Sequence, residues 1–207
     1  MQVKWKELGV VIWYPAGDGA AIMPALVLLP GMGRSPADYT TIAQDLASYG
    51  YLIAGVTPSR MMDARNLSDP ALAHELLSIW SADASFALDQ LLLDRRFRID
   101  AARVGIFGHS FGGNVALHEL ITDQRFARAA NLDGSLYGGP IDAVRKPMLI
   151  LCADGIDPEW QPFCKSGRAE CADFPKARHM DFADVHPALQ RETSDRLRTF
   201  FSNASEP

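Results

Sequence analysis

A serine between two glycines is the feature of this sequence that points most directly to chemistry. Ser110 is the centre of the segment 108–112, Gly-His-Ser-Phe-Gly. The apolar run at 104–107 comes directly before this segment, and a helical pattern begins at Asn114. A strand that enters a helix through Gly-x-Ser-x-Gly holds the serine hydroxyl clear of the sheet, where it acts as a nucleophile. The sequence therefore predicts a nucleophilic Ser110; the alternative is a serine in an ordinary glycine-rich turn.

A nucleophilic serine needs a base, and the order nucleophile, acid, histidine predicts a base late in the chain. His179 follows a short strand-like stretch and is our candidate. His186, directly before Pro187, begins the last helical pattern and is the second choice. We expect structural positions for the other three histidines, which are His74, His109 and His118.

Two aspartates are candidates for the acid that orients the histidine and stabilises its charged form. Asp133 and Asp154 each follow an apolar run, and the residues alone leave both open. The oxyanion of a tetrahedral intermediate also needs backbone N–H donors. The glycine-flanked turn at 30–33 and the residue after the serine can supply them. We predict that these donors are the amides of Met32 and Phe111.

The elements that must position these residues alternate between strand and helix along the chain. Apolar or β-branched runs between turn residues predict strands, and apolar residues at helical spacing predict helices. We expect strands at 9–14, 25–29, 51–56, 104–107, 127–132, 148–152 and 173–177, and helices at 37–49, 69–92, 114–122 and 188–201. Such alternation predicts an α/β fold, with a mostly parallel sheet and helices on both faces, in a single domain over 1–207. Reactive residues then gather where the strands end.

Composition limits the function classes. Of the 207 residues, 48% are apolar and 22% are charged, which is typical of a globular chain and predicts no membrane-spanning segment. The formal net charge of -5 provides no basic surface for nucleic acid. We find no phosphate-binding loop and no metal-ligand spacing, so we expect neither a cofactor nor a metal. Oligomeric state is left open.

The cysteines and the N-terminus leave the compartment open. Cys152 lies in an apolar run and is expected to be a core residue. Cys164 and Cys171 flank a polar loop, and a disulfide or two free thiols are equally compatible with that spacing. Residues 1–7 lack the features of a secretory signal. We therefore expect a cytoplasmic protein as written, or a secreted or periplasmic one if the chain is a trimmed mature form.

Four segments together resemble the secreted-type platelet-activating-factor acetylhydrolase family. They are 30–33 (Pro-Gly-Met-Gly), 108–113 (Gly-His-Ser-Phe-Gly-Gly), 132–134 (Leu-Asp-Gly) and 179–184 (His-Met-Asp-Phe-Ala-Asp). Plant chlorophyllases and bacterial polyester-degrading cutinases are more distantly similar. The resemblance, which runs from Ala25 to Asp184, implies an α/β-hydrolase fold and a serine esterase. That family has its acid at the position of Asp133, which we therefore prefer to Asp154.

The predicted site is open and shallow, because the connection from Asp133 to the strand at 148 has no room for a cap domain. We expect a small-molecule ester substrate with a short, acetyl-type acyl group. A polyester or lipid ester is the first alternative, an amide or peptide the second, and a non-catalytic binding protein the third. Apolar loop residues are expected to contact the substrate: Met32, Met61, Met62, Phe111, Leu136, Tyr137, Trp160, Phe163 and Phe182.

Overall fold

A computed structural model of the chain describes residues 1–5, 8–17, 21–137 and 141–202. Its centre is one eight-stranded sheet in the order β1-β2-β4-β3-β5-β6-β7-β8. β2 pairs antiparallel with β1 and with β4, and the remaining neighbours pair parallel. The strands are β1 (Gln2–Trp5), β2 (Leu8–Trp13), β3 (Ile22–Leu29), β4 (Leu52–Thr57), β5 (Arg98–His109), β6 (Arg128–Leu132), β7 (Met148–Ala153) and β8 (Glu170–Phe174).

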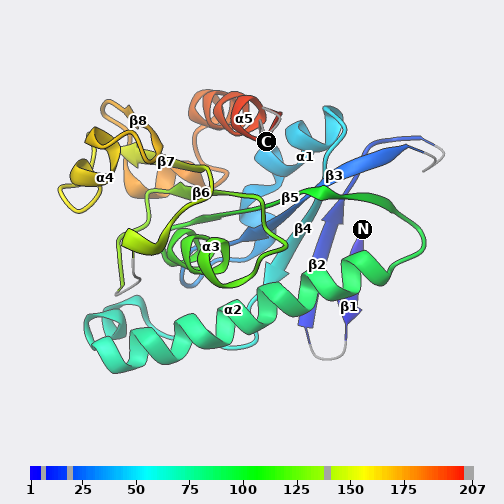
Figure 1. Cartoon of the computed structure of the whole chain (residues 1–207), viewed down its shortest axis with the longest axis horizontal. Helices are drawn as coiled ribbons and strands as arrows, with labels where there is room; N and C mark the ends of the chain where they lie inside the picture. Colours follow the sequence, from blue (N-terminus) through cyan, green and yellow to red (C-terminus); the bar gives the residue numbers. More distant parts are fainter. Residues whose placement is uncertain (6–7, 18–20, 138–140, 203–207) are drawn as a thin grey trace.

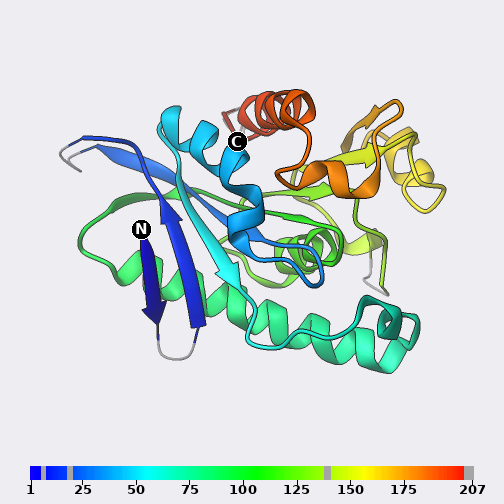
Figure 2. The same cartoon turned by 180° about the vertical axis from the view of Figure 1, so that it is seen from behind.

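Helices cover both faces of the sheet, as the two opposite views show (Figure 1 and Figure 2). α1 (Thr40–Ser48) and α5 (Pro187–Ser202) lie together on one face, and α2 (Pro70–Leu93) and α3 (Phe111–Thr122) lie together on the other. The predicted α/β class, with its mostly parallel sheet between two helical layers, is confirmed. Short helices occupy the loops: η1 (Pro36–Tyr39), η2 (Ala64–Ser68), η3 (Ile141–Ala143), α4 (Gln161–Lys165) and η4 (His179–Phe182).

Two hydrophobic layers, one on each face of the sheet, form the core. Ile106 in β5 belongs to the layer under α2 and α3, whereas its neighbour Phe107 belongs to the layer under α1 and α5. This separation follows from the alternation of side chains along a strand. Because the central parallel strands are buried on both faces, their sequences are continuous apolar runs.

Of the helices that the structure describes, only α2 has the length and apolar content to cross a membrane. It starts at Asp69, whose carboxylate accepts hydrogen bonds from two backbone N–H groups of the first turn. Its buried side chains, among them Leu76 and Trp80, pack into the hydrophobic layer on one sheet face. Core helices of globular proteins commonly have the same length and composition.

Sequence patterns locate most elements to within a few residues, and the differences fall on short or amphipathic segments. The structure has elements that were not predicted, which are β1, α4 and the short helices η2, η3 and η4, and it divides the expected 37–49 helix into η1 and α1. The last strand ends at Phe174, not at 177. β1 alternates exposed and half-buried residues at the sheet edge, so it has no buried run for an apolar pattern to reveal.

The parallel strands point their carboxyl ends toward one edge of the sheet. β3 ends just before the turn at 30–34, and β5 ends just before Ser110. β6 and β7 end just before Asp133 and Asp154. His179 follows β8 after a four-residue connection, at the start of η4. The fold therefore gathers the predicted reactive residues at the edge where α/β sheets bind their ligands.

Candidate active site

Ser110 lies in a strained turn between β5 and α3. Its backbone angles are φ 55° and ψ -124°, a conformation that residues other than glycine rarely adopt. Glycines allow the chain to fold this tightly. A methyl group at Gly108 would overlap the backbone of Gly112, and one at Gly112 would lie 2.5 Å from the carbonyl oxygen of Pro30. Ser110 is half-buried at the N-terminus of α3, where the helix dipole favours negative charge.

His179 and Asp133 meet although they are 46 positions apart in the chain. Nδ1 of His179 lies 2.6 Å from Oδ2 of Asp133. The histidine side chain is 47% exposed and the aspartate side chain 18%. Because an ionised carboxylate only accepts hydrogen bonds, Nδ1 carries the hydrogen and Nε2 is the nitrogen that can take up a proton. The ring also lies 4.6 Å, between centroids, from the ring of His109, the residue before Ser110.

The turn that carries Asp133 is held by hydrogen bonds from buried side chains. Asp133 has φ 53°, and its Oδ1 accepts the N–H of Ala153 at 2.7 Å. The buried Asn131 accepts the N–H of Gly134 at 2.6 Å and donates to its carbonyl oxygen at 3.1 Å. Trp160 Nε1 donates to the same carbonyl at 2.9 Å. These contacts leave Oδ2 of Asp133 directed to His179.

Asp154, the alternative acid, has other partners. Its Oδ1 accepts the N–H of Lys176 at 3.1 Å, and its own N–H donates to the carbonyl of Phe174 at 3.0 Å. Asp154 is exposed and closes the turn that follows β8. The structure thus joins Asp133, rather than Asp154, to His179. This geometry favours Asp133, and its role as the acid stays a prediction about catalysis.

The turn at 31–34, which carries the predicted donor Met32, packs against the serine turn. The N–H of Arg34 donates to the carbonyl of Gly31 at 3.0 Å, and Gly33 has φ 73°, as a glycine at this turn position allows. A methyl group at Gly31 would lie 3.4 Å from Cβ of Ser110. The backbone around Met32 is therefore close enough to Ser110 for the two segments to act on one bound group.

His109 is buried between three of these segments. Its Nδ1 lies 2.7 Å from the hydroxyl of Tyr39, and its Nε2 lies 2.9 Å from the carbonyl oxygen of His179. Burial, with a smaller repulsive contribution from His179, lowers the pKa of His109 to about 3. The ring is therefore neutral at neutral pH. A polar residue at the end of the buried, otherwise apolar second half of β5 was the only sequence signal for this position.

Several side chains predicted to contact substrate are buried in the core instead. Trp160 is 1% exposed and Phe182 is 0% exposed. Trp160 braces the Asp133 turn, and the Phe182 ring packs against His109 at 6.0 Å between centroids. The rings of Phe111 and Phe163 are buried as well. This burial argues against substrate contacts by these four side chains, because the large rings turn inward and fill the space beneath the loops. Their role toward a substrate stays a prediction.

The other predicted contact side chains are half-buried; they are Met32, Met61, Met62, Leu136 and Tyr137. Leu136 and Tyr137 line a cavity of about 330 Å³, which Leu67 and His74 also line. The ring of Tyr137 lies 5.5 Å, between centroids, from that of Phe111, which follows Ser110 in the chain. This contact brings the cavity to the neighbourhood of the serine turn.

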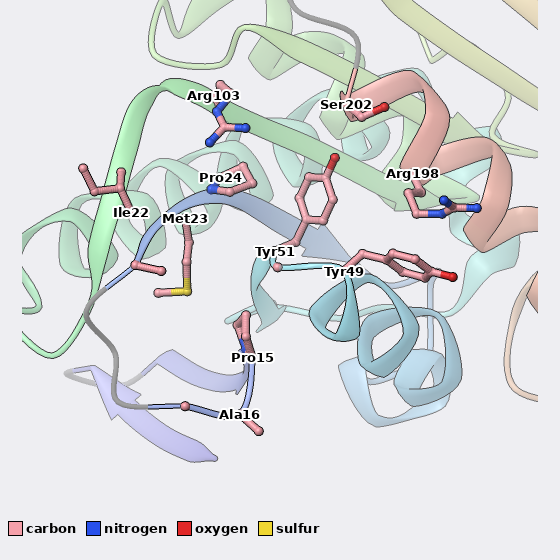
Figure 3. Close-up of a pocket in the computed structure, with 13 residues that line it drawn as sticks. Pro15, Ala16, Ile22, Met23, Pro24, Tyr49, Tyr51, Arg103, Arg198 and Ser202 are labelled. Atoms are coloured by element: carbon pink, nitrogen blue, oxygen red, sulfur yellow. The ribbon is translucent and has the colours of Figure 1, made fainter.

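A second cavity, of about 620 Å³, lies at the opposite edge of the sheet (Figure 3). Its walls include Met23 at the start of β3 and Tyr51 just before β4, together with Arg103 and Arg198. The catalytic candidates follow the carboxyl ends of the strands, whereas this cavity lies at the amino ends of β3 and β4. Its size alone therefore does not make it the reaction site.

The structure contains a disulfide between Cys164 and Cys171, the pair whose state the sequence left open. Cys152 is a buried free cysteine, as predicted for a core position. In the part of the chain that the structure describes, His, Cys, Asp and Glu side chains form no group of three or more that could hold a metal ion. Residues 138–140, inside the β6–β7 connection, lie outside the described residues.

A solved structure shares the fold over nearly the whole chain. It is a ferulic acid esterase from Streptomyces cinnamoneus, with a TM-score of 0.73 and 23% sequence identity. The match covers 95% of this chain and 84% of that one. This chain has the α/β-hydrolase fold. In this fold the Ser110 turn lies between β5 and α3, and the Asp133 turn follows β6.

Sequence comparisons also connect this α/β-hydrolase to esterases. Residues 79–157 match the family described as platelet-activating factor acetylhydrolase, isoform II. A probable 1-alkyl-2-acetylglycerophosphocholine esterase from Arthroderma benhamiae is 28% identical over 61% of this chain and 35% of its own length. A bis(hydroxyethyl) terephthalate hydrolase from Streptomyces coelicolor is 28% identical over 71% of this chain and 44% of its own length. Cutinase 2 from Thermobifida cellulosilytica is 26% identical over 70% of this chain and 52% of its own length. The matched segments thus span about half, or less, of these relatives.

Sequence reasoning did not assign a site role to Tyr39 or Asn131. Tyr39 was expected only as an apolar residue of a helix, and its hydroxyl contact with His109 depends on a partner 70 positions away. Asn131 had a detectable signal, because it is the one amide in the otherwise apolar end of β6. A buried amide in a strand usually satisfies a nearby turn, as Asn131 does with Gly134.

Proposed function

We propose that this chain is a serine esterase that hydrolyses small carboxylic esters, with Ser110 as nucleophile, His179 as base and Asp133 as acid. One observation carries the proposal: the 2.6 Å contact between His179 and Asp133 beside the strained Ser110 turn. A histidine oriented by a carboxylate next to a half-buried, strained serine is the arrangement that activates a hydroxyl. The names of the similar proteins, which are two esterases, a terephthalate hydrolase and a cutinase, support the same chemistry.

In the first half of the reaction, Ser110 Oγ attacks the ester carbonyl carbon while Nε2 of His179 takes the hydroxyl proton. Asp133 stabilises the resulting imidazolium through the Nδ1 hydrogen bond. The carbonyl oxygen becomes negative, and the N–H groups of Met32 and Phe111 bind it. The intermediate then collapses, the ester C–O bond breaks, and His179 returns its proton to the leaving alcohol.

In the second half, water attacks the acyl group on Ser110 and gives its proton to His179. The same two amides hold the second oxyanion. When this intermediate collapses, the bond to Ser110 Oγ breaks, and the proton on His179 returns to that oxygen. The products are a carboxylic acid and an alcohol, and the enzyme is regenerated.

Short acyl groups are the substrates we propose first. The cavity beside Tyr137 is about 330 Å³, near the lower end of the range for small-molecule sites. Its Leu67, Leu136 and Tyr137 side chains suit an apolar group rather than a sugar or a phosphate. The acetyl ester in the name of the Arthroderma relative supports the same class.

Esters of aromatic diacids are the second candidate. This class is favoured by the terephthalate hydrolase and cutinase relatives and by the Tyr137 ring near the serine turn. Hydrolysis of bis(hydroxyethyl) terephthalate, followed by chromatography of the released acid, measures it directly. A kcat/KM for this diester above that for p-nitrophenyl acetate would make the aromatic ester the better substrate.

The test of the proposed function combines labelling with kinetics. A fluorophosphonate probe should modify the wild-type protein once, at Ser110, and p-nitrophenyl acetate should be hydrolysed. Ser110→Ala should lose both, whereas Ser135→Ala, at the half-buried serine after Gly134, should keep both. Turnover of an aminoacyl p-nitroanilide in place of the ester would indicate an amidase. A folded wild-type protein that neither reacts with the probe nor hydrolyses either substrate would be a binding protein.

A further inference from the structure

Tyr39 and His109 form a buried connection between the three segments of the candidate site. His109 contacts Tyr39, 70 positions earlier, and His179, 70 positions later. Tyr39 in turn contacts the N–H of Gly31 at 3.0 Å. Tyr39 is 0% exposed and His109 is 1% exposed, so water cannot substitute for these partners.

The chemistry of the groups determines the direction of each hydrogen bond in the connection from Gly31 through Tyr39 and His109 to His179. A carbonyl oxygen only accepts, so Nε2 of His109 must carry the hydrogen that faces His179. Since burial keeps the pKa of His109 at about 3, the neutral ring has no second hydrogen and Nδ1 accepts. The hydroxyl of Tyr39 then donates to Nδ1, and its oxygen accepts the N–H of Gly31.

We propose that Tyr39 and His109 are positioning residues. One directed series of hydrogen bonds holds two segments at the Ser110 turn: the turn at 31–34 that carries Met32, called the oxyanion turn below, and the backbone of His179. The inference rests on the proposed esterase function for its effect on catalysis. It adds two residues that act on the reaction through other groups. Neither side chain contacts the substrate.

The oxyanion turn is held on both sides of one residue. The N–H of Gly31 donates to the hydroxyl of Tyr39, and the carbonyl oxygen of Gly31 accepts the N–H of Arg34. The carbonyl of Gly31 and the N–H of Met32 belong to the same planar peptide. Fixing this carbonyl therefore fixes the direction in which the predicted oxyanion donor points.

The base is held by its backbone as well as by Asp133. Nε2 of His109 holds the His179 carbonyl at 2.9 Å, while Asp133 holds the imidazole at 2.6 Å. A neutral His109 also matters electrostatically, because its ring lies 4.6 Å from the ring of His179. A charge on His109 would oppose the imidazolium that His179 must form during the reaction.

Tyr39→Phe tests the proposal kinetically, because it removes one oxygen and keeps the ring. We expect kcat for p-nitrophenyl acetate to fall about 10- to 100-fold with KM changed less than about twofold, since the transition state depends on these positions. The affinity for a boronic acid, which forms a tetrahedral adduct with the serine, should fall by a similar factor. Tyr51→Phe is the matched control, because Tyr51 is a buried tyrosine beside the cavity at the opposite sheet edge.

A second pair of variants separates positioning from packing. His109→Gln keeps a donor and an acceptor, whereas His109→Leu keeps only the volume. We expect His109→Gln to retain at least tenfold more kcat than His109→Leu at similar thermal stability. Equal kcat in the two variants, or a Tyr39→Phe enzyme with wild-type kcat and boronate affinity, would overturn the proposal.

Nitrogen-15 NMR of the histidine rings tests the chain independently of activity. His109 should remain a neutral ring with hydrogen on Nε2 from pH 5 to pH 8, and its Nδ1 shift should change in Tyr39→Phe. A ring with hydrogen on Nδ1, or one that titrates in this range, contradicts the proposed chain even in an active enzyme. If the ring behaves as expected but the wild type neither hydrolyses the ester nor reacts with the fluorophosphonate, the proposed function fails and the hydrogen-bond chain stands.

Discussion

Two turns at neighbouring strand ends have the same local structure and different surroundings. After β6, Asp133 has φ 53°, and after β7, Asp154 has φ 48°. Each aspartate donates its N–H to the next strand, to Leu151 or to Phe174, and each Oδ1 accepts one backbone N–H. The second oxygen differs: Oδ2 of Asp133 faces His179, while Asp154 is exposed.

What distinguishes the two turns is the structure packed around them. A methyl group on Gly134, after Asp133, would overlap the carbonyl oxygen of Ser110, whereas one on Gly155, after Asp154, would meet nothing within 4 Å. Buried Asn131 and Trp160 also brace the first turn. An aspartate at a strand end therefore becomes a candidate acid through the loops that fold against it, and its own turn geometry is not sufficient.

The largest contrast is expected from replacing each carboxylate by an amide. Asp133→Asn should lower kcat on the order of 10⁴-fold, because an amide favours the wrong histidine tautomer and cannot stabilise the imidazolium. Asp154→Asn should change kcat less than about threefold, since the Asp154 side chain accepts the backbone N–H of Lys176, a bond that an amide oxygen can also accept. Steady-state hydrolysis of p-nitrophenyl acetate measures both. A larger loss in Asp154→Asn would reverse the assignment of the acid.

The region around Asp133 should also contribute more than the region around Asp154 to the pH dependence of stability, because it includes the buried His109. The pKa of His109 is lowered from 6.5 to about 3, mainly by burial, with His179 and Arg34 lowering it and Asp133 raising it. Between these values the unfolded chain binds more protons than the folded one. The free energy of unfolding is therefore unaffected by the titration of His109 above about pH 6.5. It falls by up to roughly 5 kcal/mol as the pH falls toward 3.

Urea denaturation of wild type and of His109→Gln between pH 4 and pH 7 measures this effect. The wild type should lose more stability than the variant as pH falls, so the two curves should converge at low pH. His186→Gln is the control, because His186 is exposed in the cavity that includes Lys176 on the Asp154 side. Parallel curves for wild type and His109→Gln would contradict the expectation.

A matched glycine pair tests the packing difference itself. Gly134→Ala should cost about 3 kcal/mol and most of the activity, because its methyl group has to displace the Ser110 backbone. Gly155→Ala should cost about 1 kcal/mol through its φ of 108° alone and leave kcat near wild type. Thermal unfolding and ester hydrolysis measure both variants. Equal losses of activity would mean that the two turns are packed alike.

The smallest effect on catalysis is expected at the disulfide, on the Asp154 side of the sheet. Cys171 lies in β8, paired with Ile150 of β7, and Cys164 lies in α4. Replacing both cysteines by serine should lower stability by about 2 kcal/mol, the loop-closure entropy of so short a loop. kcat should be unchanged. Reductant should lower the melting temperature of the wild type to that of the variant and leave the melting temperature of the variant unchanged. A loss of kcat in the variant would link the disulfide to the reaction.

Much of the fold could be predicted from the sequence, because buried parallel strands are continuous apolar runs and long helices repeat their apolar residues. β7 and α5 lie within a residue or two of their predicted ranges. The burial of the predicted contact rings could not be read from the sequence, because a loop position does not show which way a side chain turns. Trp160 and Phe182 follow strand ends, as a substrate contact would, yet both fill the core.

The sequence by itself determined the serine turn and the order of the elements. The glycines around Ser110 permit the close backbone approach that the turn needs, and alternating strand and helix patterns require crossover connections. Only the tertiary structure brought Asp133 to His179 and connected Gly31, Tyr39, His109 and His179. Those contacts join residues 46 to 70 positions apart, or depend on ring orientations that packing selects. A local sequence pattern does not show which distant residues come into contact, so the surroundings of the two aspartates became distinguishable only in the folded chain.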